Sequence, residues 1–190
     1  MQKITLSIIL FLCLLTGMLQ AHNAVNFFEE YIDFSIDQQH FSVNGMYSFC
    51  NNTEKPQMQP ILFPFSEDVS KIDSIRIDNL SSSNKIPYRC LNKSLAFEFI
   101  IQPYDTVEIH IYYRQPISTV NRYIITSTKA WGKSLEKAYY TLTANKEIER
   151  GIIDFSYAPD SISNDNGIKT YYWKKYDFMP ERDFIVFLYD

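Results

Sequence analysis

The sequence predicts an all-β protein in which two antiparallel sheets pack face to face. Tyr, Phe, Ile, Thr and Val recur in short runs, and Asn, Asp, Ser and Pro, which favour turns, separate these runs. The chain contains only 5 glycines, and the apolar spacing typical of amphipathic helices is hard to find. Several runs alternate apolar and polar residues, as expected for a sheet with one face in the core and one in water.

About a dozen segments carry these strand signals. In the first of them, Phe28, Ile32, Phe34 and Ile36 fall on one face. The alternation is clearest at residues 106–114. One side carries Val107, Ile109, Ile111 and Tyr113, and the other side carries Glu108, His110, Tyr112 and Arg114. In chain order, the expected strands cover residues 28–36, 41–50, 61–65, 69–77, 85–91, 95–101, 106–114, 122–128, 137–143, 152–157, 169–178 and 184–189.

Three local features refine this assignment. Pro64 interrupts the segment 61–65, which predicts an edge strand or a bulge, because proline cannot donate to a ladder. Residues 164–167, with the sequence Asn-Asp-Asn-Gly, predict a turn. The final segment, 184–189, is apolar on both faces, so we expect it to be central in its sheet.

Short strands at this spacing, without helices long enough for crossover connections, favour a sandwich over an α/β fold. We therefore expect one immunoglobulin-like or jelly-roll-like domain over residues 22–190, because no repeat or linker divides the chain.

Residues 1–21 are predicted to form a secretory signal helix that is cleaved off. Lys3 supplies the positive charge, the following residues up to Leu15 supply a short apolar segment, and Ala21 is the best cleavage point. We therefore expect a secreted or periplasmic protein that starts at His22 and has no stable membrane anchor after cleavage.

The net charge indicates which partners to expect, and the cysteines raise the question of a disulfide. The formal net charge is −4, which disfavours nucleic acid as a partner. An oxidising compartment permits a disulfide between Cys50 and Cys90. Cys50 lies on the parity opposite to its apolar neighbours, whereas Cys90 shares the parity of Ile86 and Tyr88, so a disulfide and two separate thiols both remain open.

Several short motifs follow one another in a recognisable order. The whole resembles secreted bacterial β-sandwich domains of unknown function, which supports the fold and implies no activity. The motifs are VNGMYSF at 43–49 followed by Asn51, Phe-Pro-Phe at 63–65, Tyr-Arg-Gln at 113–115, WGKSLEKA at 131–138, Tyr-Trp at 172–173 and Phe-Met-Pro at 178–180.

One metal site can be built from the sequence. An N-terminal His22 offers an amine and an imidazole, and His110 or His40 would complete a copper site, as in copper-dependent oxidases and periplasmic copper carriers. The sequence contains no known hydrolase, zinc or phosphate-binding motif, so no cofactor and no intrinsic catalysis are expected. Glu29 and Glu30 are adjacent in a strand and therefore point to opposite faces, which indicates a solvated edge.

Aromatic residues suggest a second binding chemistry. Trp131, Tyr139, Tyr171 and Trp173 are candidates for stacking on sugars, although a role in the core explains most aromatic residues of a sandwich. Our leading hypothesis is a binding or structural protein of the cell envelope or extracellular space, with an unknown protein or a glycan as partner. Copper binding or oxidation and a glycan-binding module are the alternatives.

Overall fold

The computed structural model describes residues 24–144, 148 and 152–189, and these residues are mostly β-strand. Two 3₁₀ helices lie wholly within these residues: η1 (Val69–Lys71) and η2 (Thr126–Trp131). The strands are β1 (Val25–Ile36), β2 (His40–Asn51), β3 (Gln57–Pro64), β4 (Asp73–Asn79), β5 (Asn84–Lys85), β6 (Arg89–Leu91), β7 (Ser94–Ile101), β8 (Thr106–Pro116), β9 (Val120–Tyr123), β10 (Leu135–Ala144), β11 (Ile152–Phe155), β12 (Ser161–Asp165), β13 (Ile168–Phe178) and β14 (Phe184–Tyr189).

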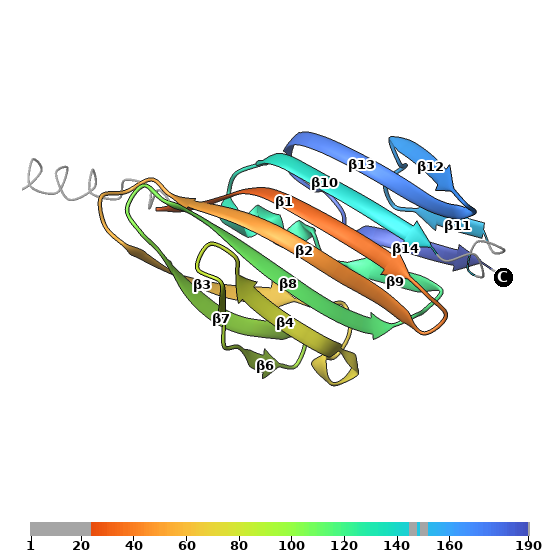
Figure 1. Ribbon diagram of the computed structural model, residues 1–190, viewed down its shortest axis with the longest axis horizontal. Helices are drawn as coiled ribbons and strands as arrows, with labels where there is room; N and C mark the ends of the chain where they lie inside the picture. Colours follow the sequence, from red (N-terminus) through yellow and green to blue (C-terminus); the bar gives the residue numbers. More distant parts are fainter. Residues whose placement is uncertain (1–23, 145–147, 149–151, 190) are drawn as a thin grey trace, which may run out of the picture.

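Eight of the strands form one large sheet, in the order β12-β13-β10-β1-β2-β8-β4-β5 (Figure 1). All of its neighbouring pairs are antiparallel except β1 and β10, which run parallel. The prediction of purely antiparallel sheets is therefore wrong at this one pair. Alternation in a sequence reports which face a residue occupies and carries no information about the direction of the neighbouring strand.

The second layer consists of two separate three-stranded sheets, β3-β7-β6 and β11-β14-β9, instead of the single sheet expected. Both pack against the same face of the large sheet. Phe63 of β3 contacts Tyr47 of β2 with ring centroids 5.8 Å apart, and Phe184 of β14 stacks on Phe34 of β1 at 4.7 Å. The core thus lies between the large sheet and a divided second layer (Figure 1).

Most expected strands are confirmed, and the differences have local causes. In β8, Val107, Ile109, Ile111 and Tyr113 are all buried, as the alternation predicts. β3 is an edge strand, as Pro64 indicates, and β14 is the middle strand of its sheet.

Three segments depart from their expected form. The segment expected at 69–77 begins as η1 because the side chain of Asp68 accepts a hydrogen bond from the backbone N–H of Ser70. The segment expected at 122–128 ends as a strand at Tyr123 and continues into η2. Pro87 lies in the segment 85–91, which divides into β5 and β6 in different sheets.

The hairpin at 164–167 is present, with Asn166 and Gly167 at φ 51° and 78°, as a tight hairpin turn requires. The strand before it, β12, was not predicted, because its residues are all exposed and give no apolar alternation.

The predicted signal helix lies outside the described residues. Within the ranges that the structure describes, no helix has the length and apolar character needed to cross a bilayer.

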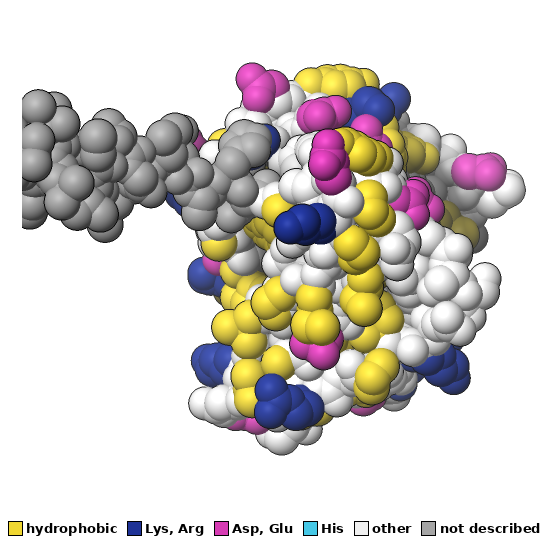
Figure 2. All heavy atoms as spheres, turned by 90° about the vertical axis from the view of Figure 1, so that its left-hand side faces the viewer, with side chains coloured by type: hydrophobic (Ala, Val, Ile, Leu, Met, Phe, Trp, Pro, Cys, Tyr) yellow, Lys and Arg dark blue, Asp and Glu magenta, His cyan; other side chains and the backbone are white. Residues whose placement is uncertain are grey.

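Exposed apolar side chains mark the outer surface of β3 and β7. Met58, Leu62 and Ile100 are 60%, 64% and 53% exposed. Figure 2 shows hydrophobic side chains gathered over the end of the molecule that lies at the left of Figure 1.

Candidate functional site

A β-bulge in β1 places a carboxyl group between the layers. The register of β1 on β2 shifts between Phe27 and Glu29, so Phe28 is an extra residue in the strand. Phe27 faces the core before the bulge, and Glu30 faces it after the bulge, together with Ile32 and Phe34. The expectation that Glu29 and Glu30 form a solvated edge is therefore wrong for Glu30, which is only 2% exposed.

Among the described residues, Glu30 has one hydrogen-bond partner. The hydroxyl of Tyr140, on the parallel neighbour β10, donates to Glu30 Oε1, and no other described residue donates to this carboxyl. Burial raises the pKa of Glu30 from 4.5 to about 7, and the hydrogen bond from Tyr140 opposes this rise to a smaller extent. Near neutral pH, the carboxyl therefore exchanges between its neutral and charged forms.

Two buried tyrosines, which bind each other, lie near Glu30. Tyr47 of β2 and Tyr123 of β9 share a hydrogen bond with their hydroxyl oxygens 2.7 Å apart. Burial raises the pKa of both phenols well above 10, so both stay protonated. Gly45 makes this arrangement possible, because a Cβ on Gly45 would overlap the hydroxyl group and ring of Tyr47.

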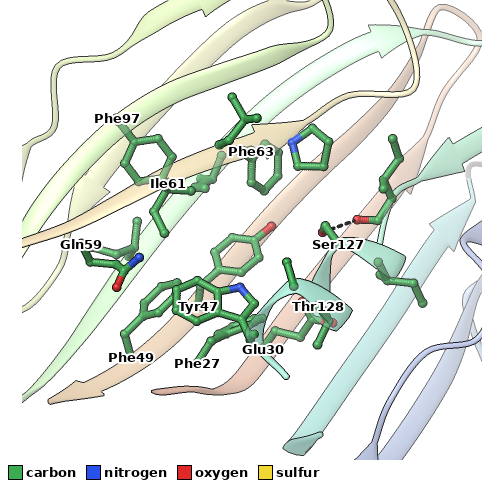
Figure 3. A pocket seen from close by; sticks show the side chains of 18 of the residues that line it. Phe27, Glu30, Tyr47, Phe49, Gln59, Ile61, Phe63, Phe97, Ser127 and Thr128 are labelled. Carbon is green, nitrogen blue, oxygen red and sulfur yellow. Dashed lines mark hydrogen bonds between the residues drawn. The ribbon is translucent and has the colours of Figure 1, made fainter. Parts of the chain in front are cut away.

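Glu30, Tyr47 and Tyr123 line a pocket of about 430 Å³ between the layers (Figure 3). The large sheet supplies one wall from β1, β2 and β8, β3 and β7 supply the opposite wall, and the segment 123–131 closes a side. The pocket thus lies between the two small sheets: the edge strands β3 and β9 both line it, and the ring centroids of Phe63 and Tyr123 are 6.4 Å apart.

The helix η2 holds an aromatic ring in this pocket. The carboxyl of Asp183 accepts hydrogen bonds from the backbone and the hydroxyl of Thr126, which fixes the start of η2. Gly132 ends the helix at φ 71°, a backbone conformation that favours glycine. Trp131 then packs against Phe27 and Phe49, with ring centroids 5.7 Å and 5.4 Å away.

The chemistry of the lining is apolar with a single acid. Phenylalanine, isoleucine, leucine and proline make up most of it, and Gln59, Ser127 and Thr128 add neutral polar groups. Glu30 carries the only carboxyl group among the described lining residues, and none of these residues is lysine, arginine or histidine. Such a lining suits an apolar ligand with few polar atoms.

The four predicted sugar-stacking residues do not lie on one surface. Tyr171 and Trp173 are buried on β13, and Trp131 lines the pocket. Tyr139 alone joins an outer aromatic cluster, with Tyr31 and Tyr176 at ring-centroid distances of 5.1 Å and 5.8 Å. The ring of Tyr139 stands at 75° to that of Tyr31 and at 85° to that of Tyr176, so the three rings form no flat platform. Glycan binding through Tyr139 stays a prediction.

Cys50 and Cys90, the cysteines within the described residues, are free thiols. Cys50 lies half-buried near the end of β2 in the large sheet, whereas Cys90 is exposed on β6 of a small sheet.

Of the three histidines considered for the copper site, His40 and His110 lie within the described residues. His22 lies outside the described residues. His110 is on the outer face of β8, where its Nε2 lies 2.6 Å from Asn44 Oδ1 and its Nδ1 lies 3.5 Å from Asp78 Oδ2. His40 lies 3.7 Å from Asp37 and 3.8 Å from Asp73. Among the described residues, no three His, Cys, Asp or Glu side chains gather as metal ligands would, and the copper site stays a prediction.

The pocket and Glu30 are the features that sequence reasoning missed. One signal was available: Glu30 has the same parity as Ile32, Phe34 and Ile36, so a carboxyl group stands in a series of core positions. A buried carboxyl is costly unless it is paired or neutral, which makes such a position a candidate for function.

The comparisons with known proteins identify the fold. No family model matches the chain, and no curated protein matches its sequence. A solved structure from Legionella pneumophila, provisionally named a nutrient binding protein, has a TM-score of 0.70 and 16% identity and covers 87% of this chain and 67% of its own. An M1 zinc metallopeptidase from Deinococcus radiodurans has a TM-score of 0.51 and 9% identity over 87% of this chain.

The chain spans 43% of the length of that metallopeptidase. At these identities the likeness concerns the fold alone. This chain therefore has a layered, mostly β fold of a kind also found in the Legionella protein.

Proposed function

We propose that this chain is an exported, non-catalytic binding protein that holds a small, mostly apolar molecule in the pocket between its layers. The pocket of about 430 Å³, with aromatic and aliphatic walls and one buried carboxyl, is the observation that carries this proposal. Its volume lies within the range of small-molecule sites, and a few polar groups in an apolar lining are typical of them. The provisional name of the Legionella protein, a nutrient binding protein, agrees with this proposal.

Titration with N-phenyl-1-naphthylamine, an uncharged apolar dye that becomes fluorescent out of water, tests the pocket. We expect saturable, one-to-one binding. Ser127 is exposed and lines the pocket, so Ser127→Trp should narrow the pocket without disturbing the core and weaken binding at least about tenfold. Lys129→Trp, on the same helix but outside the lining, is the matched control.

Equal dye binding by both tryptophan variants and the unaltered protein would place the dye elsewhere and reject the pocket. Export is tested separately, by expressing the full chain and measuring the mass of the product outside the cytoplasm. A product that begins at His22 is expected, and an unprocessed cytoplasmic chain would overturn this part of the proposal.

A further inference from the structure

The carboxyl group of Glu30 is incompletely satisfied by the protein. Tyr140 donates to Oε1, but Oε2 accepts no hydrogen bond from the described residues, although the side chain is 2% exposed and lines the pocket. A buried carboxylate without a full set of donors is unfavourable. A ligand donor that reaches Oε2 would supply the missing partner.

The charge of the lining selects the kind of donor. When Glu30 is ionised, the described lining contains one negative charge and no basic side chain. The nearby phenols of Tyr47, Tyr123 and Tyr140 stay protonated, because burial raises their pKa values well above 10. An anionic ligand would meet an uncompensated carboxylate, whereas a cation would neutralise it in a region of low dielectric constant.

The walls are suited to a cation that carries an apolar body. Phe27, Phe49 and Trp131 form a cluster with ring centroids 5.0 to 5.7 Å apart, and all three line the pocket with Glu30. The faces of aromatic rings attract ammonium groups, and their area buries hydrocarbon. A carboxylate and aromatic faces in one pocket are therefore complementary to an amine with a hydrophobic side.

We propose, on the basis of the function proposed above, that the pocket selects apolar molecules that carry a protonated amine, and that Glu30 is the residue that makes this selection. The ammonium group donates a hydrogen bond to the free oxygen of Glu30. The apolar body occupies the space between β3 and η2.

Binding of such an amine is coupled to the protonation of Glu30. The groups that face Glu30 are Tyr140 from β10, Tyr47 from β2 and Tyr123 from β9, with Tyr113 of β8 next to the last two. All four are phenols that stay protonated near neutral pH, so Glu30 is the group that titrates there. With the pocket empty its pKa is about 7, and below that pH an ammonium ligand must displace its proton.

Three probes with the same apolar body test the selection: 4-phenylbutylamine, 4-phenylbutanol and 4-phenylbutanoate. Isothermal titration calorimetry at pH 8 should give an affinity for the amine at least about tenfold above that for the alcohol, because the hydrogen bond is charge-assisted. The butanoate should bind most weakly. Affinity for the amine should fall by up to about tenfold per pH unit below pH 7, with release of a proton, whereas affinity for the alcohol should stay nearly constant.

Glu30→Gln keeps the shape and removes the charge, so it should reduce the affinity for the amine to that for the alcohol. Glu29→Gln is the matched control, because Glu29 is the adjacent carboxylate and does not line the pocket. Its Oε1 lies 2.6 Å from Lys137 Nζ, with which it forms an ion pair. If Glu30→Gln does not fold, the ratio of amine to alcohol affinity and its pH dependence decide the matter in the unaltered protein.

The outcomes separate this inference from the function on which it rests. Binding of the dye and the alcohol, with no preference for the amine and no effect of Glu30→Gln, would overturn the selection and leave the binding function standing. Failure of the dye and all three probes to bind would overturn the binding function itself.

Discussion

Glu30 couples the free energy of unfolding to pH. Its pKa is about 7 in the folded protein and near 4.5 when exposed, so the folded state binds the proton more tightly. The contribution of Glu30 to stability is therefore full below pH 4.5, decreases as the pH rises to about 7, and is constant above that. The total change is about 3 kcal/mol in favour of low pH.

We expect Glu30→Gln to remove this dependence. The difference in free energy of unfolding between the variant and the unaltered protein should change by about 3 kcal/mol between pH 4.5 and pH 8, measured by urea denaturation. The comparison cancels the opposite contributions of carboxylates such as Asp37 and Asp73, whose pKa values are lowered by hydrogen bonds. Parallel stability curves for the two proteins would contradict a buried, titrating Glu30.

Gly45 has a steric role that can be tested on its own. In the Gly45→Ala variant, the new methyl group would overlap the ring of Tyr47 and force it away from Tyr123. We expect a loss of about 1–3 kcal/mol in the free energy of unfolding, because the overlap involves a fully buried ring.

The double-mutant cycle with Tyr47→Ala supplies the control. Once the ring is gone, adding Gly45→Ala should cost far less than it does alone. Equal costs in both backgrounds would show that Gly45 acts through the backbone and not through Tyr47. This steric role also gives a physical reason for the glycine in the VNGMYSF motif, which the sequence alone left without one.

At the scale of the elements, Asn51 ties three parts of the chain together at the end of β2. Its Nδ2 donates to the carbonyl oxygens of Lys55, Ile101 and Gln102, and its Oδ1 accepts from the backbone and hydroxyl of Thr53. The side chain is 1% exposed, and its bond to the carbonyl oxygen of Ile101 is fully buried. Asn51 thereby links the β2–β3 turn to the end of β7.

Asn51→Ala should lower the free energy of unfolding by about 2–3 kcal/mol, because it removes all the hydrogen bonds by which a buried side chain joins the β2–β3 turn to the end of β7. Asn52→Ala is the control, since Asn52 is adjacent and exposed and its side chain makes only a 3.6 Å contact with the sulfur of Cys50. Urea denaturation of both variants measures the difference. Similar losses in the two variants would mean that the turn, and not the Asn51 side chain, holds these strands.

The elements that the sequence predicted well are those with a strong difference between their two faces. In β8 the alternating positions Ile109 and Ile111 are buried, and in β1 so are Ile32 and Phe34. Burial of these side chains stabilises a single register. β12 gives no such signal, since all of its residues are exposed. The bulge at Phe28 was equally hidden, because one inserted residue changes the face of its neighbours without changing the composition.

At the scale of the whole molecule, alternation predicts a mostly β, layered protein but not how the layers are divided. The order of strands and the gap between β3 and β9 depend on contacts between residues far apart in the sequence. The pocket follows from this gap, which is why none of its lining was recognised as a set. Glu30, Tyr47 and Trp131 are ordinary strand and turn residues until the second layer brings them together.

The parallel pairing of β1 with β10 has a consequence for how the protein is made. Residues 29–36 find their partners at 137–144, so the middle of the large sheet stays open until more than two thirds of the chain has been synthesised. Until then β1 offers a bare edge, and contacts this distant in sequence form slowly. The β10 of a neighbouring molecule fits that edge as well as its own, so crowded, newly made chains have a direct route to intertwined dimers.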